Sequence, residues 1–475
     1  MFLGALLMTT KPPTKSSVPI LMTVNRLFPE VLLEIFMRCL PAEQLPRPGP
    51  KDMPLLFGSV CRTWRDVAWN NPRLWTGLAL STVDLQKIDI ESLQRWLGRS
   101  GSSPLEICIG VKDNTWKSTD KFNPAESWAH RAGEIVDVLM PFSNRLKTLG
   151  VTATIQSAME ITRLLANGTP LLGKLSIKIG PRVGNKDPLV LDLSSSTQLR
   201  SLLISGAKIK PFHHDVVFQH IRKLSLDSFR ESSLSMDEWL TLLGNCPHIE
   251  KFKFALDNNK PLTPSDVHHT CYSLTEFRLQ TDRKSIDPGP ALDRLTLPAL
   301  CKLEISIEGA RKLDSWPHIA LLLNRSDSPL TDLKIKGTPM KHGDFLNCLH
   351  NAPRLRNLSV FKIPFPSEII QAMNPRNAVE KNTDCLCPDL EGIYISHCDD
   401  FHWDWNLGAM VESRWESSRK EPAWNYGRTF DFGRHKLQPL RQVTIVNSGG
   451  TSGYGMDRGN FYDENLQFKS IRYDW

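Results

Sequence analysis

The sequence has few of the features that mark membrane-bound or secreted proteins. No apolar run in its 475 residues reaches the about 18 residues that indicate a membrane-spanning helix. The opening stretch, MFLGALLMTTKPP, is only briefly apolar, and no basic residue precedes the apolar run as in a secretory signal. We therefore expect no membrane partner and a cytoplasmic or nuclear location.

Catalytic signatures are also absent. The chain contains no GxxxxGK(S/T) phosphate loop, no HExxH zinc helix and no GxSxG nucleophile elbow. Its 13 histidines are scattered, and the neighbouring His213, His214 and Asp215 are expected in a solvated loop between two strands. The sequence thus predicts a non-catalytic protein without a cofactor. An enzyme would need a deep pocket with converging polar groups.

The ten cysteines include no CxxC pair. The tightest group is formed by Cys385, Cys387 and Cys398, with His397 and His402 nearby. This group has two interpretations, a metal site or a set of reduced, buried thiols. Its spacing matches no common zinc arrangement, so we expect buried thiols and no bound metal. Unpaired thiols are typical of cytosolic and nuclear proteins.

Strong charge of one sign is lacking as well. Lys and Arg number 58 against 51 Asp and Glu, a formal net charge of +7, and no dense basic block occurs. Nucleic-acid binders usually cluster their cations with stacking aromatics. We therefore expect no nucleic-acid partner; a basic stripe along a sheet face would be the sign of that alternative.

What the chain does have is an unusually apolar stretch at residues 27–75. Glu30, Glu34 and Arg38 form one polar stripe of a predicted helix, and the other residues from Val31 to Leu40 are apolar. Such a helix must be buried on most of its circumference. About fifty residues cannot cover that much apolar surface themselves, so either the rest of the chain or another protein must do so.

A second predicted helix follows in the same stretch. Apolar residues recur at helical spacing from Phe57 to Ala68, and Asn70-Asn71-Pro72 then ends the helix. The two helices are separated by the proline-rich segment 42–53, which is expected to be a loop.

Together these segments resemble an F-box. The family pattern LP-x-E-(I/L)-L-x-x-IF, VC-x-x-W-R-x-(I/L)-A and P-x-LW is matched by LFPEVLLEIF, VCRTWRDVA and NPRLW, with Phe28 where the family has Pro. The first element matches in register at Leu27, Glu30, Val31, Leu32, Ile35 and Phe36. The long insert and the WLGRSGSSPLEI that follows are similar to the large F-box families of mushroom-forming fungi.

The resemblance implies a non-catalytic substrate-recognition subunit of a Skp–cullin–F-box ubiquitin ligase. Its F-box would bind a Skp-type adaptor, and through it a cullin complex. The chain carries no catalytic domain or zinc framework of a HECT or RING ligase. The positions that carry over, as adaptor contact or as F-box core, are Leu27, Phe28, Leu32, Ile35, Val60, Cys61, Trp64, Leu74 and Trp75. The sequence leaves open which of them are contact and which are core.

From about residue 85 the chain repeats itself. A helix, turn and strand pattern in residues 93–107 recurs in 321–335, and an L-x-x-L-x-I unit occurs eleven times. Most units are spaced within the ~20–29 residues of leucine-rich repeats, which build a parallel sheet with one strand per repeat. The second apolar positions of these units are Leu149, Leu175, Leu202, Leu224, Phe252, Phe277, Leu303, Leu333, Leu358, Ile393 and Val443. The regular asparagine ladder is missing, so the resemblance is to degenerate leucine-rich repeats.

The sequence therefore predicts an α/β fold, with an N-terminal helical F-box followed by a leucine-rich-repeat-like solenoid of about 26 residues per strand and helix or loop. The expected boundaries are a leader at 1–24, the helical domain at 25–80, the solenoid at 85–446 and a tail at 447–475.

Aromatic residues gather near the C-terminus, around 397–435. A terminal repeat has an uncovered face, so we expect these residues to form a cap, with a helix at 404–420 that turns Leu407, Met410, Val411 and Trp415 inward. The alternative is a partner-binding patch, because tryptophan dominates interface hot spots. Its candidates are Trp403, Trp405, Trp415 and Trp424.

Two functions remain as the main alternatives. In the first, the repeats hold an unknown target protein close to the ubiquitin-conjugating enzyme. In the second, the chain is a binding scaffold that acts outside a ubiquitin ligase.

Overall fold

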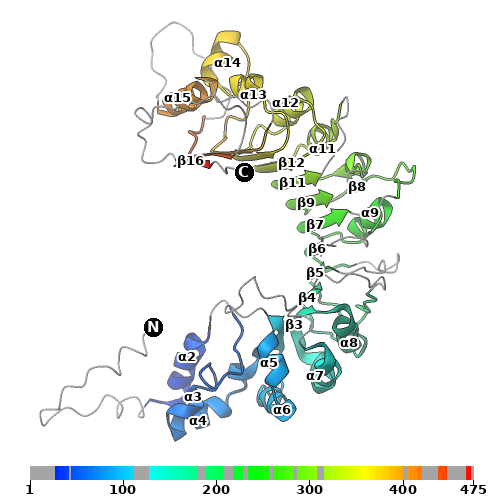
Figure 1. Ribbon diagram of the computed structural model, residues 1–475, viewed down its shortest axis with the longest axis vertical. Coiled ribbons are helices and arrows are strands. Elements are labelled where there is room, and N and C mark those ends of the chain that lie inside the picture. The colour runs from blue at the N-terminus through cyan, green and yellow to red at the C-terminus, as the bar shows by residue number, and fades with distance from the viewer. Residues whose placement is uncertain are drawn as a thin grey trace, which may run out of the picture.

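The computed structural model shows a single large sheet with helices along one side (Figure 1). It describes residues 27–41, 44–111, 128–179, 189–206, 218–227, 234–256, 260–281, 286–307, 315–398, 405–419, 437–446 and 467–471. The predicted leader at 1–24 lies outside the described residues.

The helices precede and alternate with the strands. They are α2 (Pro29–Cys39), α3 (Phe57–Val60), α4 (Arg62–Trp69), η1 (Pro72–Trp75), α5 (Thr82–Lys87), α6 (Ile90–Arg99), η2 (Ala129–Arg131), α7 (Ala132–Leu139), η3 (Met140–Arg145), α8 (Ile155–Ala166), α9 (Met236–Gly244), α10 (Gly289–Leu292), α11 (His318–Ser326), α12 (His342–His350), α13 (Ser367–Ala372), α14 (Pro375–Lys381) and α15 (Trp405–Arg419).

The strands are β1 (Gly77–Ser81), β2 (Leu105–Val111), β3 (Leu146–Ala153), β4 (Lys174–Ile179), β5 (Ser201–Ser205), β6 (Lys223–Asp227), β7 (Lys251–Leu256), β8 (His269–Thr270), β9 (Glu276–Thr281), β10 (Leu295–Thr296), β11 (Lys302–Ile307), β12 (Asp332–Lys336), β13 (Asn357–Phe361), β14 (Gly392–Ser396), β15 (Gln442–Val446) and β16 (Gln467–Ile471). Strands β8 and β10 form a separate two-stranded sheet, and the other fourteen form one sheet in chain order.

Every neighbouring pair in the large sheet is parallel. All eleven predicted apolar units coincide with strands of this sheet, and their second apolar positions, from Leu149 to Val443, pair with one another in register. The predicted α/β class with a parallel sheet is therefore confirmed. The helix, turn and strand predicted for 93–107 and for 321–335 are also present.

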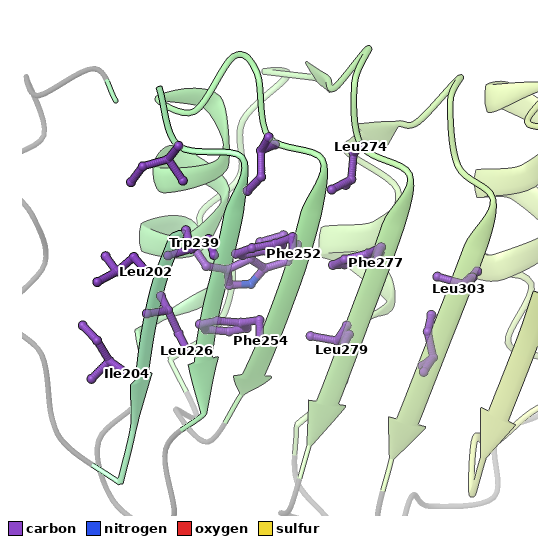
Figure 2. Packing of buried hydrophobic residues seen from close by; sticks show 14 of the residues in the cluster. Leu202, Ile204, Leu226, Trp239, Phe252, Phe254, Leu274, Phe277, Leu279 and Leu303 are labelled. Atoms are coloured by element: carbon purple, nitrogen blue, oxygen red, sulfur yellow. The ribbon is translucent and has the colours of Figure 1, made fainter. Parts of the chain in front are cut away.

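The sheet has one apolar and one polar face because side chains alternate along each strand. In β4 the apolar Leu175 and Ile177 are buried and the intervening residues are not. Figure 2 shows the apolar side chains of neighbouring strands on the same side of the sheet as Trp239 of α9. The ring of Trp239 lies 6.0 Å from that of Phe252 and 5.8 Å from that of Phe254. Helices thus cover the apolar face.

The molecule as a whole is an open arc. Figure 1 shows the strands along the inner side of the arc and the helices along its outer side. Helices α2 to α4 lie at one end, and α13 to α15 lie at the other. The polar sheet face therefore lines the concave side.

Three features differ from the predicted pattern. The sheet begins at Gly77, before the expected start of the repeats at residue 85. Residues 467–471, placed in the predicted tail, form β16, which pairs in parallel with β15. The second helix is interrupted at Cys61, whose backbone is extended (φ −156°, ψ 174°) and whose Sγ accepts a hydrogen bond from the Trp64 amide at 3.5 Å. Cys61 thus caps α4, a role that its apolar spacing does not reveal.

The C-terminal helix α15 confirms the helix predicted at 404–420. Leu407, Met410 and Val411 are buried as expected, and Trp415 is half-buried. The fully buried Arg414 is unexpected. Its guanidinium donates to backbone carbonyl oxygens of the α13–β14 segment, at 3.0 Å to Met373, 2.8 Å to Leu386 and 2.9 Å to Cys387.

Candidate partner-binding surface

The N-terminal helices share a small aromatic core. Phe36 of α2 stacks on Phe57 of α3, with ring centroids 4.0 Å apart and planes 7° from parallel. Trp64 of α4 meets Phe36 edge to face at 4.9 Å. These three rings hold α2, α3 and α4 together, and Leu32 and Ala68 complete the buried set.

This helical core continues into the sheet domain through Trp75. Its Nε1 donates to the Ala68 carbonyl at 2.8 Å, and its ring meets that of Trp96 in α6 at 4.9 Å. The Arg99 guanidinium lies 4.7 Å from the ring centroids of both Trp69 and Trp75. The N-terminal helices therefore have a fixed packing contact with the first helix of the repeats.

Helix α2 leaves an apolar face uncovered. It begins at Pro29, which suits the first helical position because proline has no amide hydrogen to bond. Phe28 at its N-cap is 75% exposed, Val31 46% and Ile35 37%. Residues three and four apart lie on one helix face, so these side chains form a single apolar stripe.

The neighbouring helix α3 also has exposed apolar residues at its two ends. Leu56, directly before α3, is 36% exposed, and Val60 at the end of α3 is 50% exposed. Because Phe57 of α3 stacks on Phe36 of α2, the two exposed sets belong to packed, adjacent elements. We call Phe28, Val31, Ile35, Leu56 and Val60 together the N-terminal apolar surface.

The structure separates the predicted contact residues from the core residues. Leu32, Trp64, Leu74 and Trp75 are buried inside the chain. Phe28, Ile35 and Val60 are exposed, while Leu27 and Cys61 are half-buried. Of the two covers for α2 that the sequence left open, the chain itself supplies little, because only Leu32 and Phe36 of this helix are buried.

Sequence reasoning did not assign Val31 and Leu56 to the candidate surface. Val31 follows Phe28 by three residues and precedes Ile35 by four, so helical spacing could have found it. Leu56 carried no such signal, because its exposure depends on where α3 begins.

The cysteine group near the C-terminus does not converge on a common point. The Cys387 thiol donates to the carbonyls of Leu349 and Ala352, both at 3.8 Å, and burial raises its pKa to about 12. The Cys398 thiol donates to Val360 and Ser396 carbonyls instead. His402 lies outside the described residues. Within the described ranges, no three His, Cys, Asp or Glu side chains gather as a metal site would require.

One further polar pair and the predicted aromatic candidates lie elsewhere in the chain. The ring of His318 is hydrogen-bonded to the Asp293 carboxylate at 2.9 Å, beside Trp316. Trp403, Trp424 and the Trp405 side chain lie outside the described residues, and Trp415 is half-buried on α15. Among the helices that the structure describes, none is long and apolar enough to cross a bilayer.

Comparison with known proteins identifies no relative. No protein-family model matches the chain, and no curated protein matches it.

Proposed function

We propose that this chain is an F-box protein that serves as the substrate-recognition adaptor of a Skp–cullin–F-box ubiquitin ligase. The N-terminal helices are the F-box, and the remainder is a leucine-rich-repeat-like solenoid that holds a target protein. The observation that carries the proposal is the N-terminal apolar surface, which lies within the segment that resembles the F-box pattern.

The physical argument begins with the cost of exposed apolar area. Exposed single hydrophobic residues are ordinary, but a group of large ones on adjacent elements marks an interaction site. Burying a side chain of this size in an interface contributes about 1.5–3 kcal/mol before the costs of association. Phe28 is the most exposed of the five and is the expected anchor.

The rigid aromatic core beneath the surface suits this role. Leu32 and Phe36 hold α2 on α3 and α4, so the exposed stripe keeps its shape before the partner arrives. A preorganised surface loses less conformational freedom on binding. The contact between Trp75 and Trp96 then transmits the position of the adaptor to the repeat arc.

In this function the chain itself performs no chemistry. It holds a target near the ubiquitin-conjugating enzyme, and the rate gain comes from proximity. The arc in Figure 1 places the N-terminal helices at one end and leaves its inner face open. That arrangement suits simultaneous binding of an adaptor and a target.

The decisive experiment is co-purification of a Skp-type adaptor and its cullin with the double variant Phe28→Asp and Ile35→Asp. Two carboxylates on the apolar stripe should reduce adaptor recovery at least about tenfold, because an unpaired charge is costly in an apolar interface. The matched control is Val267→Asp with Tyr272→Asp, two residues that are exposed outside the F-box.

Both variants must retain the far-ultraviolet circular dichroism of the unaltered protein. Full adaptor recovery with the first variant would contradict the proposal. Recovery of the adaptor without a cullin would instead favour the scaffold that acts outside a ubiquitin ligase.

A further inference from the structure

The inner face of the sheet carries more positive than negative side chains. From β4 to β12, the inward-facing positions include nine cations and four carboxylates. The cations are Lys174, Lys178, Lys223, Lys251, Lys253, Arg278, Lys302, Lys334 and Lys336, and the carboxylates are Asp227, Glu276, Glu304 and Asp332. We call the nine cations the inner cationic stripe.

The carboxylates are already occupied within the sheet. Asp227 pairs with Lys253, and Glu276 pairs with Lys251. Glu304 lies between Arg278 and Lys334 and pairs with both. Asp332 accepts a hydrogen bond from the Asn357 amide at 3.0 Å. The acidic groups therefore neutralise part of the stripe and leave the excess cations facing the arc.

The excess is concentrated at β4 and β6. Lys174, Lys178 and Lys223 are exposed, and none has a carboxylate within 4.0 Å among the described residues. Their register neighbours on β3 and β5 are uncharged threonines and serines. On its other side Lys223 stands in register with Lys251, another cation. Like charges directly opposite one another are destabilising, and Lys251 already pairs with Glu276, so no register neighbour compensates the charge of Lys223.

A groove runs along this face. It has a volume of about 540 Å³ and is lined by residues from β5 to β13, among them Glu276, Glu304, Asp332 and six of the nine cations. Lys174 and Lys178 of β4 lie beside the groove and not in its lining. Ser201, Ser225 and Ser359 supply hydroxyl groups within it. Beyond its lining, past Ser359, the rings of Phe361 on β13 and Tyr394 on β14 lie 5.0 Å apart.

We propose that the inner face binds an extended acidic segment of the target protein, with its carboxylates over Lys174, Lys178 and Lys223. This inference rests on the proposed function only in taking the repeats as the part that holds the target. Strands β4 and β14 are eight strand spacings apart in the sheet, which is about 38 Å at the usual separation of neighbouring strands. About 12 residues of extended chain cover that length.

The carboxylates of the inner face favour a peptide over a nucleic acid as the ligand. A cationic face with paired aromatics can also bind single-stranded RNA. A polyphosphate backbone would, however, meet mostly ion-paired cations in the middle of the groove, because Lys251, Arg278 and Lys334 are already bonded to Glu276 and Glu304. A peptide can place its carboxylates at one end and neutral or basic residues over these acidic groups.

The test uses the full chain and a labelled 12-residue peptide with alternating Glu and Ser in one half and only Ser in the other, and its binding is followed by fluorescence anisotropy. The variant Lys174→Glu, Lys178→Glu and Lys223→Glu should weaken binding at least about tenfold, because three surface attractions become repulsions. The control variant Lys87→Glu, Arg354→Glu and Lys381→Glu changes the net charge equally at exposed positions outside the inner face. It should alter the affinity by less than about twofold at a fixed salt concentration.

Three outcomes would overturn the proposal. The peptide fails to bind, or both triple variants weaken its binding equally. In the third, a 12-nucleotide single-stranded RNA binds more tightly than the peptide, and reversing Lys174, Lys178 and Lys223 weakens that RNA binding. The reversed lysines have no internal ion pair to lose, so folding should be retained, and adaptor co-purification checks it. Absence of peptide binding in a chain that still binds the adaptor would contradict this inference but leave the F-box proposal standing. Loss of adaptor binding by Phe28→Asp with Ile35→Asp should leave peptide binding unchanged.

Discussion

Single buried side chains at the strand positions hold the repeats together. Leu333 of β12 is 1% exposed and lies in register between Leu303 and Leu358, which are equally buried. Each such side chain packs under the outer helices and against its two neighbours. Its removal leaves a cavity that the flanking strands cannot close without breaking their own backbone hydrogen bonds.

Leu333→Ala is therefore expected to lower the free energy of unfolding by about 2–5 kcal/mol. The measurement is the shift in the denaturant midpoint of the full chain. Leu321→Ala on α11 is the matched control, because that leucine is 45% exposed and should change the stability by less than about 0.5 kcal/mol. Equal shifts for the two variants would contradict the assigned register.

Elements at the two ends of the arc are stabilised in different ways. Helix α2 is held by apolar contacts of Leu32 and Phe36 and leaves its other apolar side exposed. Helix α15 is held partly by Arg414, whose charge is balanced by backbone carbonyl dipoles. Burial lowers the pKa of this guanidinium, yet arginine stays protonated at any ordinary pH. The carbonyls that it contacts belong to the segment between α13 and β14.

Arg414→Met keeps much of the side-chain volume but leaves these buried carbonyls without a donor. The expected cost is at least about 3 kcal/mol, since each unsatisfied buried polar group costs about 1–3 kcal/mol. Hydrogen exchange should quicken in α15 and in residues 382–388, while that of α11 stays unchanged. Arg376→Met is the control, because that arginine is exposed and pairs with Glu416 at the surface. Unaltered exchange in α15 would show that Arg414 does not hold the helix.

At the scale of the whole molecule, one hydrophobic core runs from the N-terminal helices to the last strands. The first strand starts directly after Trp75, whose ring packs on Trp96. The N-terminal helices and the large sheet are thus joined through packed side chains as well as through the chain. Their relative orientation should therefore be fixed, as the proposed function requires.

Removal of residues 1–75 should therefore disturb more than adaptor binding. Trp96 is buried against Trp75 in the full chain and becomes exposed on truncation. Hydrogen exchange in β1 to β3 is therefore expected to quicken, while β11 to β13 stay protected. The point variant Phe28→Asp with Ile35→Asp is the control, since both residues are exposed and should leave exchange in β1 to β3 unchanged. Equal protection of β1 in the truncated and full chains would mean that the two parts are independent.

The local spacing of apolar residues was sufficient to predict the strands. The L-x-x-L-x-I spacing located all eleven predicted strands, because alternation along a strand and burial of one face are written directly into neighbouring residues. The helical spacing of apolar and polar residues located α2 and α15. The interruption between α3 and α4 at Cys61 was not predicted. A cysteine at this position can either continue a helix or cap the next one, and the packing of the neighbouring elements determines which of the two occurs.

The sequence by itself determined the class of the fold, the order of the strands and the excess of apolar surface near Leu27. Tertiary structure alone decided that Trp64, Leu74 and Trp75 are core, and that Phe28, Ile35 and Val60 are available to a partner. It also decided that lysines distant in sequence line one concave face. Periodicity encodes which face of an element is apolar, whereas exposure depends on what the other elements cover.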